Sequence, residues 1–508
     1  MQNASVNHTT QMERNIVLMK KRISIDVQKI QSELDYWKAP GMTVTLIQEG
    51  EQDQIQCFGY RDLEKKLPMT EDSKFCVASC SKSMTGVLIA ALVDRGYLDL
   101  DTPVCNYVPE MKMWDAEASA RMSLRDMLWH RTGLGGYDVI WPNEEGRGHT
   151  AERLRYLKPN KPFREVSQYS NLIYIMIGYV AERVTGRPWS ELMKEYVFDP
   201  IGMDRTCCLA SEILEDQDHA EPYQVIDGKV TKLPFWNMNM AGPAASVNST
   251  ARDMAKWIRF HMNGGKNERG EQIISEEIFR QIHQPQIAYD DSGRPDEDFY
   301  SCDGYGLGWR IGRYRGIWLQ KHGGKIDGYS TLQMYLPEEK VGFILMMNLH
   351  TPSDPVFYPI VYSMMDSIFG LDEIDWDKRF RERQEYTVQN RYEGCQRDLT
   401  KGVLPKESKG TSFSEDIHAW EGSYTEPGYG TMTIETCGAE NGAEHLQLSY
   451  RDQTLPLHHW GGEYFWMDGV KEDVLTMRIP VIFRKKEGQC QVDVWYEPLT
   501  EPAQFLKK

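Results

Sequence analysis

The spacing of apolar residues along the chain predicts a mixed α/β region followed by an all-β region. Up to about residue 375, runs with apolar side chains three and four positions apart alternate with short apolar or alternating runs. The first pattern is typical of helices and the second of strands. From about residue 413 onward, short alternating segments are separated by glycines and polar turns, as in a small barrel or sandwich.

Individual elements follow from the same pattern. Helices are expected at residues 15–38, about 79–95, 122–129, 172–184 and 249–261. Strands of the first region are expected at residues 42–48 and 54–60, which form a hairpin, and at 305–311, 317–321, 331–336 and 341–348. Strands of the second region are expected at residues 431–434, 445–450, 464–467, 474–479 and 491–495.

Length and composition divide the chain into several parts. At 508 residues it is too long for a single compact core. We expect a disordered N-terminus, a main α/β domain, a charged helical linker and a small all-β barrel, at residues 1–14, 15–375, 376–412 and 413–508 respectively.

The net charge of −17 argues against nucleic acid or an anionic membrane surface as a partner. No apolar run reaches the ~18 residues that a membrane span requires. The first residues show no basic segment followed by an apolar one, so we expect a cytoplasmic protein.

The cysteine and histidine patterns point away from disulfides and metals. Cys76, Cys80, Cys207 and Cys208 lie in apolar segments, so free thiols are expected. There is no Cys-x-x-Cys and no His-Glu-x-x-His motif, so no metal site and no cofactor are expected.

The first candidate for chemistry is Ser79-x-x-Lys82, at the head of an apolar helix. Two residues three apart lie on one helix face, so the amine can reach the serine hydroxyl. A lysine can act as the base that a serine nucleophile needs, and a helix N-terminus stabilises developing negative charge. The tetrad also occurs by chance in long chains, so it needs support from elsewhere.

Two further stretches give that support. Tyr169-Ser170-Asn171 precedes a helix that is apolar on nearly all sides, and it offers a general acid/base and an amide; it could equally be a simple helix cap. The second, residues 322–325 (His322-Gly323-Gly324-Lys325), lies among predicted strands, where its glycines would let a ligand approach the backbone. His322 could instead be a structural histidine.

Together and in this order, the three stretches resemble the motifs of the penicillin-recognising serine hydrolases. The group most similar is the class C β-lactamase-like family, which includes D-amino-acid peptidases and serine esterases of β-lactamase fold. The resemblance covers about residues 20–370 and extends to His130-Arg131-Thr132-Gly133-Leu134 and Tyr305-Gly306-Leu307-Gly308-Trp309. The segment Trp420-Glu421-Gly422-Ser423-Tyr424 is similar to the lipocalin-like domain appended to some of these enzymes.

The resemblance implies an antiparallel sheet flanked by helices, together with an all-helical subdomain. It implies that Ser79 forms an acyl-enzyme, that Lys82 and Tyr169 share the proton transfers, and that Asn171 orients the substrate. It also implies an oxyanion hole made by the backbone N–H groups of Ser79 and Lys325.

The third motif departs from the Lys-Thr-Gly form, because it carries His322. In that position the histidine would shape the electrostatics behind Tyr169. A fixed positive charge for a substrate carboxylate is then missing, which disfavours β-lactamase activity itself.

The leading hypothesis is a serine hydrolase that cleaves an ester or amide bond of a small molecule or peptide. The first alternative is an acyltransferase, in which an apolar rim would admit an alcohol or amine acceptor; its candidate residues are Trp141, Phe235, Trp236, Met238, Met240 and Trp309. The second is a non-catalytic penicillin-binding-like module. We expect the barrel to be a separable folding unit that shapes substrate access or assembly and carries no catalytic group. The oligomeric state stays open.

Overall fold

The computed structural model describes residues 24–142, 146–226, 228–289, 296–350, 354–389, 402–405, 412–413, 416–438, 444–451, 453–468, 478–497 and 501–508. By contacts the chain divides into two compact units. Unit 1 comprises residues 1–99 and 185–384, and unit 2 comprises residues 100–184 and 385–508. The domain limits expected from composition follow a different division and stay a prediction.

Unit 1 is built on an eight-stranded antiparallel sheet with the order β3-β2-β1-β12-β11-β10-β9-β8. The first and last strands of the unit lie side by side in its centre, where Val44 pairs with Leu345. The predicted N-terminal hairpin and antiparallel sheet are confirmed. The strands are β1 (Gly41–Gln48), β2 (Gln54–Asp62), β3 (Leu67–Pro68), β8 (Tyr300–Tyr305), β9 (Arg310–Tyr314), β10 (Ile317–Ile326), β11 (Tyr329–Leu336) and β12 (Val341–Met347).

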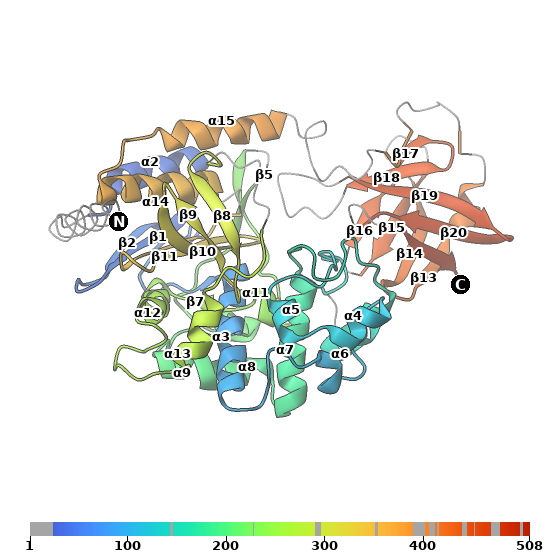
Figure 1. Cartoon of the computed structure of the whole chain (residues 1–508). Coiled ribbons are helices and arrows are strands. Elements are labelled where there is room, and N and C mark those ends of the chain that lie inside the picture. The colour runs from blue at the N-terminus through green and yellow to red at the C-terminus, as the bar shows by residue number, and fades with distance from the viewer. Residues whose placement is uncertain are drawn as a thin grey trace. The chain divides into compact units, whose positions relative to one another are not determined.

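Helices cover both faces of this sheet (Figure 1). On one face α2 (Val27–Trp37), α14 (Asp354–Phe369) and α15 (Trp376–Gln389) enclose a core of large apolar side chains. On the other face α12 (Ala251–Met262) packs against the central strands. The remaining elements of unit 1 are β4 (Phe75–Cys76), η1 (Ala78–Cys80), α3 (Ser81–Asp94), α8 (Trp189–Met193), η4 (Lys194–Phe198), α9 (Asp199–Ile201), α10 (Ala210–Leu214), β5 (Tyr223–Ile226), β6 (Lys229–Lys232), α11 (Gly242–Ala245), β7 (Asn248–Ser249) and α13 (Glu276–Ile282).

Two predicted elements of unit 1 need correction. The helix expected from residue 15 begins at Val27 within the described residues, because the Asp26 side chain accepts a hydrogen bond from the Lys29 N–H and caps it there. Its first part lies outside the described residues. The single strand expected at residues 305–311 is wrong: β8 ends at Tyr305 and β9 begins at Arg310, with a turn between them.

The charged segment after residue 376 begins as a helix, as predicted, and its apolar side chains are part of the unit 1 core. Trp376 and Phe380 of α15 are buried there. On its polar side Lys29 pairs with Asp377 at 2.9 Å. Residues 390–401 and 406–411 of the predicted linker lie outside the described residues.

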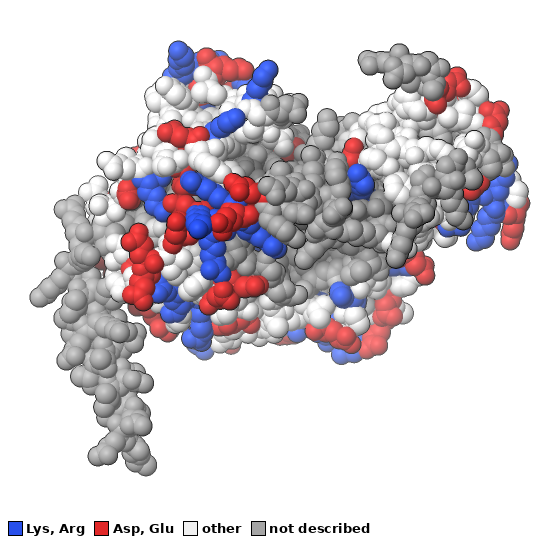
Figure 2. Space-filling model, turned by 90° about the horizontal axis from the view of Figure 1, so that it is seen from above, with Lys and Arg blue, Asp and Glu red and all other residues white. Residues whose placement is uncertain are grey.

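Charges of both signs are interspersed on the face that Figure 2 shows, without a large patch of one sign.

Unit 2 contains an all-helical part. Its longest helix, α7 (Asn171–Thr185), is buried on most of its sides, as its continuous apolar sequence predicted. The elements of this part are η2 (Val104–Asn106), α4 (Ala116–Arg121), α5 (Leu124–Leu128), α6 (Arg147–Arg153), η3 (Leu154–Tyr156) and α7 (Asn171–Thr185).

The rest of unit 2 is a nearly closed antiparallel barrel of nine strands, preceded by η5 (Ile417–Trp420). The strand order is β16-β15-β14-β13-β21-β20-β19-β18-β17. The predicted all-β barrel is confirmed; of the strand expected at residues 474–479, the part before Arg478 lies outside the described residues. The strands are β13 (Gly422–Glu426), β14 (Gly430–Gly438), β15 (Glu444–Tyr450), β16 (Gln453–Pro456), β17 (His458–Gly461), β18 (Tyr464–Asp468), β19 (Arg478–Lys486), β20 (Gln489–Val494) and β21 (Ala503–Lys507).

The described residues were compared with the expectations for membrane spans, disulfides and metal sites. None of their helices is long and apolar enough to cross a membrane. The nine cysteines among them are all free, as expected. No group of three or more of their His, Cys, Asp and Glu side chains is arranged to hold a metal ion.

Candidate active site

Ser79 lies in a short turn between a strand and a buried helix. The turn is the 3-10 segment η1, and the α-helix α3 begins two residues later, at Ser81. The preceding residue, Ala78, has a φ of +46°, a conformation that is uncommon for any residue other than glycine. Backbone strain of this kind is concentrated at functional sites. The turn leaves Ser79 half-buried, whereas its neighbours on both sides are buried.

Lys82 is held directly beside the Ser79 hydroxyl. Its Nζ lies 3.0 Å from Ser79 Oγ and donates a second hydrogen bond of 3.0 Å to the carbonyl oxygen of Ala244. The lysine side chain is fully buried. Because the carbonyl fixes the amine in place, a proton can pass between Ser79 and Lys82 without rearrangement of either side chain.

The other serines near the turn have structural hydrogen bonds. Ser81 Oγ accepts from the Val247 N–H at 3.0 Å, and Ser83 Oγ donates to the Cys80 carbonyl at 2.8 Å. Both residues are fully buried. Of the three serines in this stretch, Ser79 is therefore the one with a hydroxyl that is both partly exposed and next to an amine.

Strand β10 brings the third motif against the Ser79 turn. An ideal Cβ on Gly324 would lie 2.1 Å from the Val77 carbonyl oxygen and 3.2 Å from the Ser79 nitrogen. Only a glycine permits this approach. Side chains alternate along the strand, so His322 and Gly324 are buried while Gly323 and Lys325 are exposed.

His322 is buried and hydrogen-bonded through both ring nitrogens. Its Nε2 lies 3.0 Å from the Tyr305 hydroxyl and its Nδ1 lies 2.7 Å from the Gly323 carbonyl. The carbonyl can only accept, so Nδ1 carries the proton and Nε2 accepts from Tyr305. Burial lowers the pKa of His322 well below its usual value, and the charges of Arg310 and Lys82 lower it further. His322 is therefore uncharged at neutral pH.

Tyr305 is thus a residue of the site that sequence reasoning placed only in a family-like stretch, without a role. We expect Tyr305→Phe to lower kcat/KM roughly two- to tenfold, the effect of one lost hydrogen bond, because His322 loses the donor that fixes its ring. The matched control is Tyr289→Phe, since Tyr289 stacks on Tyr305 and its hydroxyl accepts from Arg310 instead. Steady-state kinetics of the two variants give the comparison; equal losses would contradict a specific role for Tyr305.

The turn that follows Tyr305 explains why the predicted strand breaks. Gly308 has a φ of +85°, and an ideal Cβ there would lie 2.5 Å from the Lys82 carbonyl oxygen. Likewise, a Cβ on Gly86 of α3 would lie 2.5 Å from the Leu307 carbonyl oxygen. The backbone of the turn is therefore packed directly on the helix that carries Lys82.

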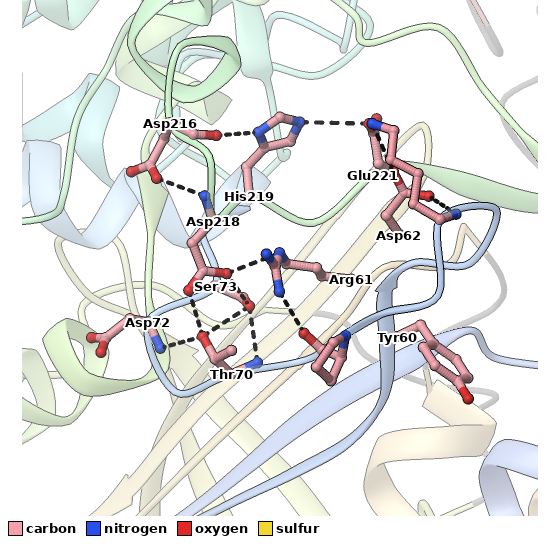
Figure 3. A network of polar contacts seen from close by, with 12 residues as sticks. Tyr60, Arg61, Asp62, Thr70, Asp72, Ser73, Asp216, Asp218, His219 and Glu221 are labelled. Atoms are coloured by element: carbon pink, nitrogen blue, oxygen red, sulfur yellow. Dashed lines mark hydrogen bonds and ion pairs between the residues drawn. The ribbon is translucent and has the colours of Figure 1, made fainter.

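A polar network ties the segment before the Ser79 turn to a distant loop (Figure 3). Asp218 accepts hydrogen bonds from Thr70 Oγ1 at 2.6 Å and Ser73 Oγ at 2.7 Å, and it pairs with Arg61 Nε at 3.2 Å. Lys74, which follows Ser73 in the chain, is nearly buried and pairs with Asp216 at 2.9 Å. The network thus fixes the residues that lead into β4 and η1.

This network predicts an acid-sensitive contribution to stability. Burial alone would raise the pKa of Asp216, but hydrogen bonds and the charge of Lys74 lower it to about 2. Its ordinary value is near 4, so its contribution is present above about pH 4 and is lost as the pH falls through about 2.

Asp216→Asn should therefore destabilise the protein at pH 7 by about 1–3 kcal/mol, the range for hydrogen bonds to charged groups, and by less at pH 3. Urea unfolding at the two pH values measures both free energies. The exposed Asp372→Asn is the control. A difference from wild type that stays constant between pH 7 and pH 3 would contradict the assignment.

In unit 2, the loop at His130 holds the Tyr-x-Asn stretch. His130 Nδ1 accepts from the Ser170 N–H at 3.1 Å, and its carbonyl accepts from the Gln168 N–H at 2.7 Å. The imidazole also lies 4.5 Å from the Tyr169 ring, centroid to centroid. Tyr169 stays half-buried at the start of α7.

Asp138 joins the two other predicted residues of unit 2. Its Oδ1 accepts from Asn171 Nδ2 at 2.9 Å and from Trp141 Nε1 at 3.0 Å. Sequence reasoning missed Asp138, because it follows a glycine-rich loop in which no local pattern distinguishes a functional carboxylate from a turn residue.

A comparison with known protein families decides the classification. The family model described as Beta-lactamase matches residues 28–359. The chain belongs to the Beta-lactamase family. The predicted resemblance to β-lactamase-like and penicillin-binding serine hydrolases is thereby confirmed, and the match includes all three motif stretches of this family member.

Relatives of this Beta-lactamase-family chain have several different names. It is 24% identical over 466 residues to unguisins hydrolase ungD of Aspergillus violaceofuscus, covering 86% of this chain and 81% of the relative. It is 25% identical over 316 residues to penicillin-binding protein 4 of Amycolatopsis lactamdurans, covering 61% of this chain and 81% of the relative.

Solved structures of the same fold support the architecture. The octameric penicillin-binding protein homologue from Pyrococcus abyssi aligns with a TM-score of 0.58 at 22% identity, covering 95% of this chain and all of that chain. The D-amino acid amidase from Ochrobactrum anthropi aligns with a TM-score of 0.54 at 23% identity, covering 71% of this chain and 98% of that chain. These similarities show the fold alone.

The structure brings only some of the predicted site residues together. Within unit 1, Ser79 and Lys82 lie against the strand of residues 322–325, and Ala244 and Tyr305, which sequence reasoning did not assign, complete their contacts. Within unit 2, Asn171 and Trp141 share Asp138.

Two of the residues proposed for the apolar rim differ in how deeply they are buried. Trp236 is half-buried between β6 and α11. Trp309, by contrast, is fully buried with its ring 4.8 Å from that of His261, so its assignment to a rim is wrong.

Proposed function

We propose that this Beta-lactamase-family protein hydrolyses an amide or ester bond of a small molecule or peptide through an acyl-enzyme on Ser79. The observation that carries the proposal is the contact of 3.0 Å between Ser79 Oγ and Lys82 Nζ, with Lys82 anchored on the Ala244 carbonyl. A half-buried serine on a strained turn, one helical turn from a buried amine, is the arrangement that an activated nucleophile requires.

In the proposed reaction Ser79 Oγ attacks the substrate carbonyl carbon, and the hydroxyl proton passes to Lys82. The N–H groups of Ser79 and Lys325 receive the oxyanion, which needs donors fixed in advance. The C–N or C–O bond then breaks, and the leaving amine or alcohol takes the proton. Water attacks the acyl ester in the second half of the reaction, which releases the acid and restores Ser79.

We further propose that Tyr169 and Asn171 of unit 2 complete this machinery. Tyr169 would share the proton transfers with Lys82, and the Asn171 amide would hold a polar group of the substrate. The position of both at the start of a buried helix, fixed by His130 and Asp138, supports these roles.

The neutral His322 narrows the substrate class. Because His322 is neutral and buried, it cannot supply the charge that a substrate carboxylate needs, which favours amides and esters without a carboxylate at that position. A relative named hydrolase agrees with hydrolysis, and a structural neighbour named D-amino acid amidase agrees with an amide substrate. We prefer hydrolysis over acyl transfer, because Trp309 is fully buried and cannot belong to the apolar rim that was proposed to bind an acceptor.

The test is labelling with a fluorophosphonate, followed by peptide mapping and a substrate panel. Ser79 should carry the label, and the panel should contain D- and L-phenylalanine p-nitroanilide, p-nitrophenyl acetate and a β-lactam. Turnover of an anilide or the ester with release of free acid supports the proposal. A label on Ser81 or Ser83 would refute the assignment of the nucleophile, and product formed only with an added alcohol or amine would favour the transferase.

A further inference from the structure

The C-terminal barrel places one buried carboxyl group against the loop that precedes Asp138. Glu497 follows β20 and is only 7% exposed. The backbone N–H groups of Gly136 and Tyr137 both donate hydrogen bonds to its carboxyl group. An ideal Cβ on Gly135 would lie 3.0 Å from Glu497 Oε2, so the loop backbone lies directly on the carboxyl group.

The loop needs such a support because its conformation is strained. Tyr137 has a φ of +48°, which costs free energy for a residue with a side chain. Two consecutive N–H groups that point at one acceptor fix the peptide planes on both sides of this residue. The Tyr137 hydroxyl also donates to the Lys158 carbonyl at 2.6 Å.

The next residue transmits this placement to the proposed site. Asp138 directly follows Tyr137, and its Oδ1 accepts from Asn171 Nδ2 at 2.9 Å. Glu497, the strained loop, Asp138 and Asn171 thus form a continuous series of contacts within unit 2, from the barrel to the start of α7.

We infer that Glu497 of the barrel is a positioning residue for the Asn171 amide and thereby determines which substrates are accepted. The inference rests on the proposed function of Asn171. It also changes the expected role of the barrel, which would contribute to substrate recognition through a defined side chain rather than only restrict access.

Glu497→Gln is a conservative substitution for the test, because the side chain of Glu497 is mostly uncharged. Burial and, to a smaller extent, the nearby charge of Asp138 raise the pKa of Glu497 to about 8, although the hydrogen bonds from Tyr137 and Gly136 act to lower it. The carboxyl group is therefore mostly neutral at pH 7, and a glutamine of the same shape still offers a carbonyl oxygen to the two N–H groups.

The barrel also offers a matched control. Glu501 forms an ion pair with Lys158, so it joins the barrel to the same helical part of unit 2, but it is exposed and does not contact residues 135–138 in the described contacts. Glu501→Ala removes a carboxylate and a contact without removing the support of the loop.

The first measurement is hydrogen–deuterium exchange of the full-length protein at pH 7. Peptides covering residues 134–140 should exchange roughly tenfold faster or more in Glu497→Ala than in wild type, because their N–H acceptor is gone. Glu497→Gln and Glu501→Ala should exchange like wild type. Equal exchange in Glu497→Ala and Glu501→Ala would overturn the inference.

The second measurement separates positioning from general damage. For phenylalanine p-nitroanilide, kcat/KM of Glu497→Ala should fall roughly 10- to 100-fold, as expected when a substrate-orienting group is misplaced. For p-nitrophenyl acetate, which has no amide for Asn171 to hold, the fall should stay within about twofold, the size of a neutral surface change. Glu497→Gln should recover the anilide activity.

The double variant Glu497→Ala/Asn171→Ala tests the route of the effect. If Glu497 acts through Asn171, the double variant should be no less active on the anilide than Asn171→Ala alone. Fully additive losses, or equal losses on ester and anilide, would overturn the inference. If Glu497→Ala does not fold, Asp138→Ala interrupts the same series of contacts and should show the same substrate dependence.

Failure of the inference is distinguishable from failure of the proposed function. A wild-type protein that is not labelled by a fluorophosphonate and cleaves neither probe refutes the proposed function, and the exchange experiment still decides whether Glu497 supports the loop. A wild-type protein that is labelled and cleaves the anilide, with Glu497→Ala behaving like Glu501→Ala, refutes only the inference.

Discussion

Ser79→Ala is expected to lower kcat by at least ~10⁴-fold and to abolish fluorophosphonate labelling, because removal of a nucleophile leaves only binding and oxyanion stabilisation. The protein should remain folded, since Ser79 Oγ is half-buried and its described hydrogen bond is to Lys82. Steady-state kinetics and intact-mass analysis give the two values.

Ser81→Ala is the matched control for this prediction. It removes a hydroxyl two residues away that accepts from the Val247 N–H. We expect a loss of about 1 kcal/mol in stability from the lost hydrogen bond, with labelling and turnover retained. If the Ser81→Ala protein folds but cannot be labelled, Ser79 is not the nucleophile.

The second large effect is expected for Gly324→Ala, which should lower kcat roughly 10²- to 10³-fold, the effect of losing one oxyanion donor. The added methyl group would lie 2.1 Å from the Val77 carbonyl oxygen and 3.2 Å from the Ser79 nitrogen. Strand β10 must then move away from the Ser79 turn, and the N–H of Ser79 becomes less accessible. Overpacking of this kind also costs about 1–3 kcal/mol of stability.

Gly323→Ala, one position earlier in the same strand, is the comparison for Gly324→Ala. A Cβ on Gly323 would have the Thr331 carbonyl oxygen as its nearest neighbour, at 3.9 Å, so the substitution fits without displacement. Its effect on kcat should be far smaller. Thermal unfolding of both variants separates lost activity from lost structure. If the two substitutions reduce kcat equally, the close approach at Gly324 is not what the reaction depends on.

Much of the candidate site could be predicted because its parts are encoded locally. Ser79 and Lys82 are three residues apart before a helix, and that spacing alone places the amine near the hydroxyl. The buried helix after Asn171 was predicted from its continuous apolar residues, and the antiparallel sheet and the barrel from the alternation of their strands.

Local patterns failed where glycines serve tertiary packing. The strand expected through residues 306–309 is a turn, because Gly308 packs on the backbone of α3. The periodicity of apolar residues carries no information about such a contact between distant segments. Trp309 was expected at a rim on the basis of its hydrophobic character alone, yet the fold places it in a buried aromatic cluster.

The sequence by itself determined which side chains can do chemistry: a serine with a lysine one helical turn away, a tyrosine and an asparagine before a buried helix, and a histidine on a glycine-containing strand. Only the tertiary structure decided what holds them. Ala244 anchors the lysine, and Tyr305 holds the ring of the histidine. A glutamate more than 350 residues along the chain from its loop supports the carboxylate that binds the asparagine. These partners are backbone groups or common polar residues far away in the chain, so no spacing rule connects them, and their roles arise from distances that the folded chain alone sets.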